Sequence, residues 1–434
     1  MKISFLTSNT PLYGNHRAGS TVQFALALQA ATQGISVDIH LMNGSSEISP
    51  KTLAIFRDFN INIFDWGQCF PPNQAFQDFP AHNSFGYITE FINSKNYDQH
   101  IYFWDSKAEF TLPYINGFKV GYLAQPICQA WLSLLCRSLI DERLLAHHEP
   151  GSLITVCDQL KYYKQKKELG NHPFIVEALR QQLKHIDNLR FLNRSFCIAN
   201  GASYWYNKHS IINQYLPNCW PSYSLERPET TGFRNILVEI PHPPRRLDSC
   251  SLKPIRILAN IGRIDSHTGN LQGLDYLQNV LIPLVLKFGL SNHVEFLIVG
   301  AGEPISRHRQ LISLNCVKYL GFVPNFESII EKSDCLLILN NLGNYQAGYT
   351  RVMVAFSKGL PVIASNSISI QIPEITTNNT FLFSTSEILF EIISGLSTRN
   401  PFHVNRYNEI SSTCLPTYSD SYAPTQIINR LICC

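Results

Sequence analysis

The sequence predicts an α/β protein with two domains, each built on a doubly wound parallel sheet. Its 434 residues exceed the roughly 250–300 residues at which one hydrophobic core stops growing, so two domains of about 200 residues are expected. Short β-branched and aromatic segments alternate with helical patterns in both halves, which is typical of parallel sheets covered by helices. A proline-rich, charged stretch at residues 240–246 interrupts this alternation, because neither a helix nor a central strand persists across it.

The first half, residues 1–240, is predicted to form the N-terminal domain. An apolar-periodic helix from about residue 21 to residue 33 follows the first strand, and Gly34 ends it. The first strand, this helix and the second strand therefore form one βαβ unit. Strands of this half are expected at residues 3–6, 36–41, 61–65, 100–104, 120–123, 153–156 and 196–199.

The second half, residues 247–414, is predicted to repeat the pattern as a C-terminal domain. Its strands are expected at residues 255–259, 294–299, 317–320, 335–339 and 362–364. Its helices are expected at residues 271–288, before Asn315, at 326–332 and at 351–358. The last segment, residues 415–434, changes from polar to apolar, and we expect it to cross back to the first domain as a helix.

Composition excludes several classes of protein. A net charge of +3 from 35 basic and 32 acidic side chains gives no reason to expect nucleic acid as a partner. The lysine-rich residues 161–167 leave a peripheral contact with an anionic membrane open, although such stretches are more often solvated helix faces. The 12 cysteines are scattered without metal-like spacing, which indicates reduced thiols in a cytoplasmic protein. No signal peptide and no apolar window long enough for a transmembrane helix is expected.

The loops after the strands carry the candidate binding residues, because open parallel sheets bind ligands beyond the carboxyl ends of their strands. Asn260-Ile-Gly-Arg263 follows one strand, Gly300-Ala-Gly-Glu303 follows the next, and residues 343–351 open a helix. Glycine lets a phosphate approach the backbone, and arginine supplies a permanent forked charge. Each signal alone is common, since an arginine in a loop is usually solvated and a glycine pair often only makes a turn.

Taken in this order and spacing, the loops resemble the C-terminal domain of retaining GT-B glycosyltransferases of the large group 1 (GT4-type) family. The resemblance covers residues 255–375 and includes Tyr319-Leu-Gly-Phe-Val323 and the segment from Thr350 to Ser365. It implies a GT-B fold, in which two Rossmann-like domains face each other across a cleft. It also implies a hexosyltransferase-type enzyme of carbohydrate biosynthesis that uses a nucleotide-sugar, either a UDP- or a GDP-sugar. The acceptor, which the N-terminal domain would bind, is a sugar, a lipid-linked sugar, a small molecule or a peptide.

The resemblance places Arg263 and Arg351 near the donor diphosphate, Gly321 and Phe322 near the base, and residues 346–349 near the donor sugar. The family normally carries two glutamates eight positions apart, where this sequence has Gln346 and Val354. Glutamine still hydrogen-bonds sugar hydroxyls, but valine cannot hold a ribose diol. A degenerate, non-catalytic GT-B protein that serves as a binding partner or scaffold therefore stays open as the alternative. The complete set of predicted donor residues is Gly262, Arg263, Asn270, Gly300, Gly302, Glu303, Gly321, Phe322, Gln346, Ala347, Gly348, Tyr349, Thr350 and Arg351.

The N-terminal half resembles the family only in layout. Gly19 and Ser20 are interpreted as part of an acceptor-side or phosphate-facing loop, with a plain helix cap by Ser20 or Thr21 as the alternative. The histidine that the family carries after the fourth or fifth strand is not evident, and Asp105 is the best polar candidate there. Asp105 and Gln346 are the predicted catalytic residues. No Asp-x-Asp motif or metal-ligand spacing is found, so we expect no cofactor and a metal-independent transfer with retention of configuration. An epimerase on the same fold needs paired carboxylates, and no such pair is seen.

Overall fold

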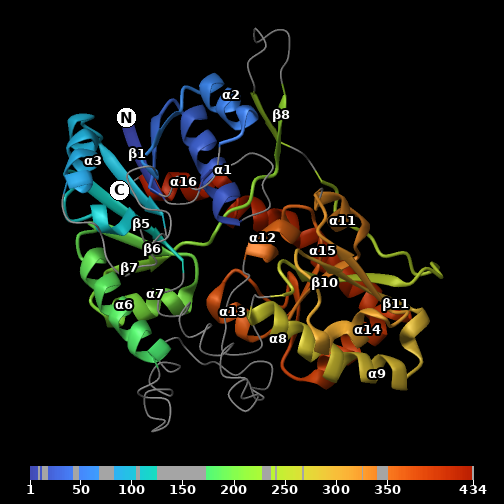
Figure 1. The fold of residues 1–434 in the computed structure, drawn as a ribbon. Helices are drawn as coiled ribbons and strands as arrows, with labels where there is room; N and C mark the ends of the chain where they lie inside the picture. The colour runs from blue at the N-terminus through green and yellow to red at the C-terminus, as the bar shows by residue number, and fades with distance from the viewer. Residues whose placement is uncertain are drawn as a thin grey trace. The chain divides into compact units, whose positions relative to one another are not determined.

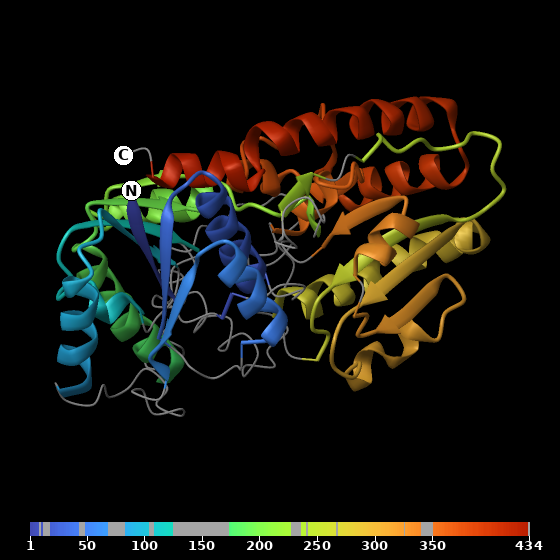
Figure 2. The same cartoon turned by 90° about the horizontal axis from the view of Figure 1, so that it is seen from above.

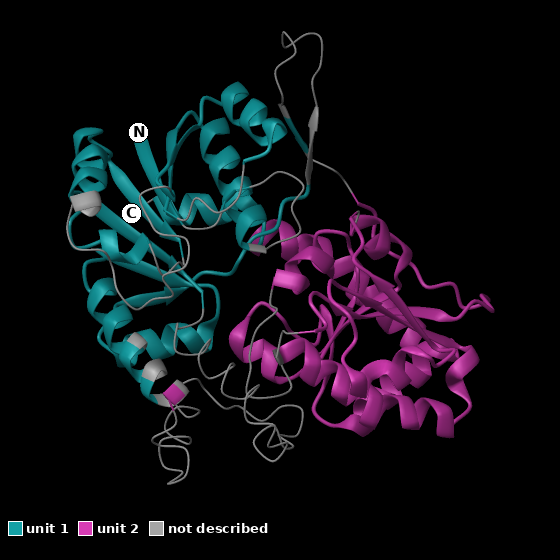
Figure 3. Cartoon of the chain, in the orientation of Figure 1, with its two compact units in different colours: residues 1–128, 176–240, 422–434 teal, residues 129–175, 241–421 magenta. Residues whose placement is uncertain are grey.

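The computed structural model describes residues 1–7, 10–11, 18–42, 48–67, 83–103, 108–124, 173–226, 236–239, 242–265, 268–324, 326–339 and 350–432. By the contacts within them, the residues divide into two compact units (Figure 3). Unit 1 comprises residues 1–128, 176–240 and 422–434, and unit 2 comprises residues 129–175 and 241–421. The strand predicted at residues 153–156 and the lysine-rich residues 161–167 lie outside the described residues.

Unit 1 contains a seven-stranded sheet in the order β3-β2-β1-β4-β5-β6-β7, in which every neighbouring pair is parallel. The strand order reverses between β1 and β4, which is the topological switch of a doubly wound sheet. The strands are β1 (Lys2–Thr7), β2 (Ser36–Leu41), β3 (Asn62–Asp65), β4 (Gln99–Phe103), β5 (Phe118–Leu123), β6 (Arg194–Cys197) and β7 (Asn213–Tyr215). A hairpin of β8 (Tyr223–Glu226) and β9 (Ile236–Glu239) forms a separate two-stranded sheet. The helices are α1 (Ala18–Thr32), α2 (Pro50–Asp58), α3 (Asn83–Ser94), the 3-10 turn η2 (Ala108–Thr111), α6 (Pro173–Leu189), α7 (Asn200–Lys208) and α16 (Pro424–Ile432).

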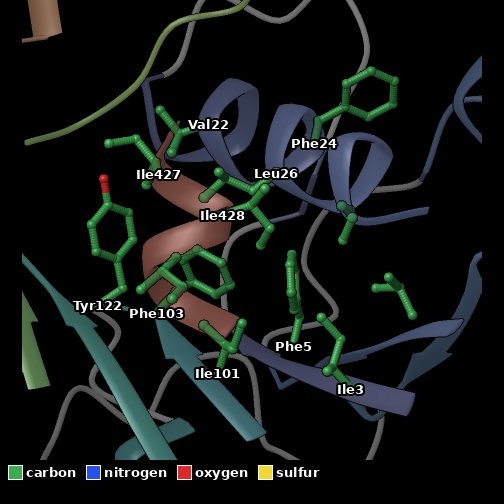
Figure 4. Packing of buried hydrophobic residues seen from close by; sticks show 14 of the residues in the cluster. Ile3, Phe5, Val22, Phe24, Leu26, Ile101, Phe103, Tyr122, Ile427 and Ile428 are labelled. Carbon is green, nitrogen blue, oxygen red and sulfur yellow. The ribbon is translucent and has the colours of Figure 1, made fainter. Parts of the chain in front are cut away.

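The core of unit 1 joins the two ends of the chain. Side chains alternate along a strand, so Ile3 and Phe5 of β1 lie on one face of the sheet together with Ile101 and Phe103 of β4. Ile427 and its neighbours on α16 pack into this same cluster beside α1 (Figure 4). Figures 1 and 2 show α16, drawn in red, among the blue and green elements of unit 1. The Gln99 side chain also donates a hydrogen bond to the carbonyl of Leu431 over 2.6 Å, so the last helix is an integral part of this unit.

The opposite face of the sheet carries a buried hydrogen-bonded chain through His40. The indole N–H of Trp66 can only donate, so Nδ1 of His40, 3.2 Å away, accepts and carries no proton. Nε2 of His40 therefore donates to the Tyr97 hydroxyl over 2.9 Å, and that hydroxyl donates to Asp38 over 2.7 Å. Both imidazole nitrogens of His40, the Trp66 indole N–H and the Tyr97 hydroxyl therefore each have a hydrogen-bond partner while the imidazole stays neutral.

Stability of unit 1 should fall as the medium becomes acidic. Burial lowers the pKa of His40 to about 3 and that of His100 to about 4, from the 6.5 of an unperturbed histidine. Because the folded-state pKa values lie below that of the unfolded chain, the unfolded chain takes up protons first as the pH falls. The contribution of the neutral histidines to the free energy of unfolding is therefore complete only above pH 6.5. Urea unfolding should show a loss of about 2 kcal/mol per histidine between about pH 7 and about pH 5.

The matched control for this prediction is His100→Asn, because the amide group of asparagine replaces Nδ1 of the imidazole, which lies 2.6 Å from the Ser4 hydroxyl. With one of the two histidines removed, the acid-dependent loss should be about half as large. An unchanged loss would show that other groups cause the pH dependence.

Unit 2 contains a six-stranded parallel sheet in the order β12-β11-β10-β13-β14-β15. The strands are β10 (Ile255–Ile261), β11 (Val294–Val299), β12 (Val317–Gly321), β13 (Cys335–Ile338), β14 (Val362–Ser365) and β15 (Thr380–Phe383). The first helices are α8 (Thr268–Tyr276), the π-turn η4 (Leu277–Leu281), α9 (Ile282–Lys287), the 3-10 turns η5 (Leu290–Asn292) and η6 (Ser306–His308), α10 (Arg309–Ile312) and α11 (Glu327–Lys332). The later helices are α12 (Thr350–Phe356), α13 (Ser367–Gln371), α14 (Ser386–Ser397) and α15 (Pro401–Ser421).

The helix predicted at residues 271–288 is confirmed, and it contains one irregular turn. Helical residues continue without a break from Thr268 to Lys287, through α8, η4 and α9. In η4 the amide of Ile282 donates to the carbonyl of Leu277, five residues earlier. Pro283 follows at the start of α9 and has no N–H to continue the regular ladder, and this widened turn was not predicted.

The segment that enters unit 2 is fixed to it by Arg245. The guanidinium of Arg245 donates to the carbonyls of Glu331 and Ser333 over 3.0 and 2.8 Å, and its backbone N–H donates to the Ser411 hydroxyl.

None of the helices in the described ranges has the length and the apolar composition that a membrane-spanning helix needs.

Candidate functional site

Three glycine-containing strand ends meet at the carboxyl edge of the unit 2 sheet. The amide of Gly262, after β10, donates to the carbonyl of Val299, and the amide of Gly300, after β11, donates to the carbonyl of Gly321, at the end of β12. Gly262 has a φ of +124° and Gly321 a φ of +63°, which side chains rarely adopt. A Cβ atom at Gly300 would overlap the carbonyl of Gly262. The predicted glycines thus come together, and their small size is what allows the strand ends to approach.

Arg351 is tied to this edge through Asn270. The guanidinium Nη2 of Arg351, in the first turn of α12, donates to Oδ1 of Asn270 over 2.6 Å. The amide nitrogen of Asn270 donates to the carbonyl of Arg263 over 2.7 Å. Nη2 of Arg351 would also lie 3.1 Å from a Cβ atom at Gly262. Asn270 is 1% exposed and its side chain joins Arg351 to the Arg263 carbonyl, while its predicted contact with the donor stays a prediction.

Arg263 forms a two-bond ion pair that the sequence reasoning missed. Its Nε and Nη2 donate to the two carboxylate oxygens of Asp265 over 3.0 and 2.7 Å. The hydrogen bond and the charge of Asp265 raise the pKa of Arg263 further above its usual value. A signal was available, because an acid two residues after an exposed loop arginine is within reach of it.

The other predicted residues of unit 2 lie around this edge. Phe322 follows β12 and is 65% exposed, so its ring is available to a ligand. Glu303 is exposed on the turn after β11. The pKa of Tyr319 is raised, mainly by the burial of Tyr319 and also by the negative charge of Glu303. Thr350 begins α12. Val354, which stands where the family has a glutamate, lies in α12, is buried and has no polar side-chain group.

The predictions for unit 1 fare differently. Gly19 and Ser20 lie in the first turn of α1, which begins at Ala18, and not in the loop before it. The alternative of a helix cap by Ser20 or Thr21 was also wrong, because both residues are themselves helical. Asp105 lies outside the described residues, as do the unit 2 residues Gln346, Ala347, Gly348 and Tyr349.

A buried network in unit 1 was not found from the sequence. The carboxylate of Glu109, in η2, lies 2.6 Å from Nδ1 of His185 on α6, and Nε2 of His185 lies 3.1 Å from the Tyr206 hydroxyl. Asn188 donates to the second oxygen of Glu109 over 3.2 Å. Glu109 and His185 are 76 positions apart in the sequence, so no local sequence pattern predicts their contact.

Metal-binding geometry is not seen in the described ranges, where no group of three His, Cys, Asp or Glu side chains is arranged to hold an ion. All of the cysteines in those same ranges are free thiols, and burial raises the pKa of Cys197 to about 12.

Comparisons with known proteins agree on the kind of domain that carries this edge. The profile of the family described as glycosyl transferases group 1 matches residues 255–398, which include the glycine turns and both arginines. No curated protein sequence matches the chain.

Solved structures match over nearly the whole chain. A glycosyltransferase from Rickettsia africae is 13% identical with a TM-score of 0.57, and the match covers 99% of this chain and 96% of that one. HepE of Anabaena in complex with UDP is 13% identical with a TM-score of 0.55, covering 99% and 98%. WaaG, described as a glycosyltransferase involved in lipopolysaccharide biosynthesis, is 12% identical with a TM-score of 0.54, covering 100% of both chains. At such low identities the likeness is one of fold, with two parallel-sheet domains.

Proposed function

Because residues 255–398 are a group 1 glycosyltransferase domain and the whole chain has the GT-B fold, we propose that this protein moves a sugar from a nucleoside-diphosphate sugar to an acceptor hydroxyl with retention of configuration. The observation that carries the proposal is the convergence of Gly262, Gly300 and Arg351 at one sheet edge. Residues 247–414 hold the donor, and residues 1–240 bind the acceptor.

The diphosphate is held by guanidinium groups and by close backbone approach. Arg351 supplies a charge whose position is fixed by Asn270, and Arg263 supplies a second charge on the adjacent loop. Glycines at this edge leave room for phosphate oxygens beside the backbone, and arginine matches their geometry with paired N–H groups. These charges take the place of a metal ion in stabilising the leaving group.

The base and the sugar lie on either side of the diphosphate. The exposed ring of Phe322 stacks on the base. The resemblance to the group 1 family assigns Gln346, Ala347, Gly348 and Tyr349 to the donor sugar. UDP- and GDP-sugars are the proposed donors, and the complex of HepE with UDP supports the first. The bond from the anomeric carbon to the diphosphate oxygen breaks, and the acceptor hydroxyl oxygen bonds that carbon on the same face. The hydroxyl proton passes to the departing diphosphate oxygen. Asp105 is the proposed polar residue on the acceptor side. Positioning and electrostatics, rather than a protein nucleophile, supply the rate enhancement.

The test is turnover. The full chain is incubated with a panel of UDP- and GDP-sugars, with and without simple sugar and lipid-linked acceptors, and released nucleoside diphosphate is measured. Release from one donor, accelerated by an acceptor, supports the enzyme. Absence of release from every donor would contradict it.

The second candidate is a non-catalytic GT-B protein that acts as a binding partner or scaffold. It is motivated by Val354, because a buried valine cannot accept hydrogen bonds from a ribose diol as a carboxylate does. Absence of release from every donor, together with no saturable binding of UDP or GDP to the full chain, identifies this case.

A further inference from the structure

The surroundings of Asp265 differ from those of an ordinary surface acid. A Cβ atom at Gly302 would overlap the Asp265 carboxyl group, so the carboxylate rests directly against the backbone of the turn after β11. Gly302 has a φ of +95°, and its carbonyl accepts a hydrogen bond from the Tyr319 hydroxyl over 2.7 Å. The preceding residue, Ile264, is buried and donates to the carbonyl of Ala301 over 3.1 Å. Both contacts place Asp265 against the turn at Ala301 and Gly302.

The Arg263 side chain is more exposed than that of Asp265, with 61% of its surface exposed against 28%. A long exposed arginine samples many rotamers, and each must be given up when a ligand is bound. The two hydrogen bonds from Asp265 fix the plane of the guanidinium, because they engage Nε and Nη2 at once.

We propose that Asp265 is a positioning residue, which orients the Arg263 guanidinium so that it meets the donor diphosphate in a single preformed arrangement. This inference rests on the proposed function of the same site. Two effects of the carboxylate oppose each other: it orders Arg263, and it repels an anionic ligand. Arg263 is exposed and Asp265 is partly exposed, so water and salt screen the repulsion between the Asp265 carboxylate and a bound diphosphate. The ordering of Arg263 acts through direct hydrogen bonds and is screened less. Ordering therefore prevails, and loss of the carboxylate weakens binding.

A double-mutant cycle on the full chain tests this proposal. Inorganic pyrophosphate is the probe, because it has both phosphates and neither base nor sugar, and its dissociation constant is measured by calorimetry for wild type, D265A, R263A and the double variant. We expect D265A alone to raise the dissociation constant roughly three- to tenfold, from the rotamer freedom it restores. In the R263A background, D265A should change it less than about twofold, since no guanidinium is left to orient.

Each other outcome is decisive. Equal weakening in both backgrounds would mean that Asp265 only supports the turn at Gly302, and tighter binding by D265A would mean that repulsion dominates; both overturn the proposal. D265N, which keeps the size and one acceptor oxygen, should fall between wild type and D265A, and it guards against misfolding of the alanine variant. If wild type binds neither pyrophosphate nor UDP nor GDP, the proposed function itself fails, whereas normal wild-type binding with no coupling sinks only the role of Asp265.

Discussion

Replacing Arg351 by alanine is expected to weaken binding of the nucleoside diphosphate by roughly 10- to 100-fold, because charge-assisted hydrogen bonds contribute about 1.5–3 kcal/mol. The effect is large because the position of the Arg351 guanidinium is fixed at the edge where the diphosphate is proposed to bind. It donates to Asn270 over 2.6 Å and lies beside Gly262, where the diphosphate would approach the backbone. Titration of UDP and GDP into the variant and wild type measures the change.

The matched control is Lys287→Ala. Lys287 is an exposed cation at the end of α9, just before β11 begins, and therefore belongs to the amino edge of the same sheet. It carries the same charge in the same unit, so a general loss of positive charge would affect both variants alike. Equal dissociation constants for wild type and Arg351→Ala would contradict the proposal that the diphosphate binds at this edge of the sheet.

Replacing Glu109 by alanine is expected to destabilise unit 1 by about 3 kcal/mol, because each buried hydrogen-bonding group left without its partner costs about 1–3 kcal/mol. Glu109 is 2% exposed, and its two oxygens face His185 and Asn188. Without the carboxylate, both side chains lose their acceptor in a region closed to water. Urea unfolding at neutral pH, followed by circular dichroism, gives the free energy of unfolding.

An exposed acid on the same helix as His185 provides the control. Asp187 pairs with Arg190 three positions later, and both side chains are more than half exposed. Asp187→Ala should change the stability by no more than about 0.5 kcal/mol. A comparable loss in the two variants would mean that the Glu109 network contributes nothing beyond an ordinary surface pair.

Much of the fold follows from local patterns. The segments at residues 36–41 and 294–299 are strands with those same limits. The first alternates polar and apolar residues and the second is almost wholly apolar, and both patterns are typical of strands. The edge strands β7 and β15 were missed because Asn213–Tyr215 and Thr380–Phe383 are short and depend on pairing with a neighbour. Helix α15 was also missed, since Pro416 lies inside it and normally signals a helix end, whereas burial of Cys414 and Tyr418 keeps the helix continuous.

The site was predictable only as a location. A parallel sheet binds ligands at the carboxyl ends of its strands, and this rule led to Gly262, Gly300 and Arg351. It gives no account of which side chains support others, because the link from Arg351 to Asn270 spans 81 positions and depends on helix placement. The contact of Asp265 with Gly302 likewise arises only when two loops meet.

Amide hydrogen exchange of the full chain, with and without saturating UDP or GDP, tests most directly whether the nucleoside diphosphate binds at this edge of unit 2. The account predicts slower exchange on binding at the amides after β10, β11 and β12 and in the first turn of α12, around Gly262, Gly300, Phe322 and Arg351. Protection confined to other segments, or no protection at a nucleotide concentration that saturates binding, would contradict it.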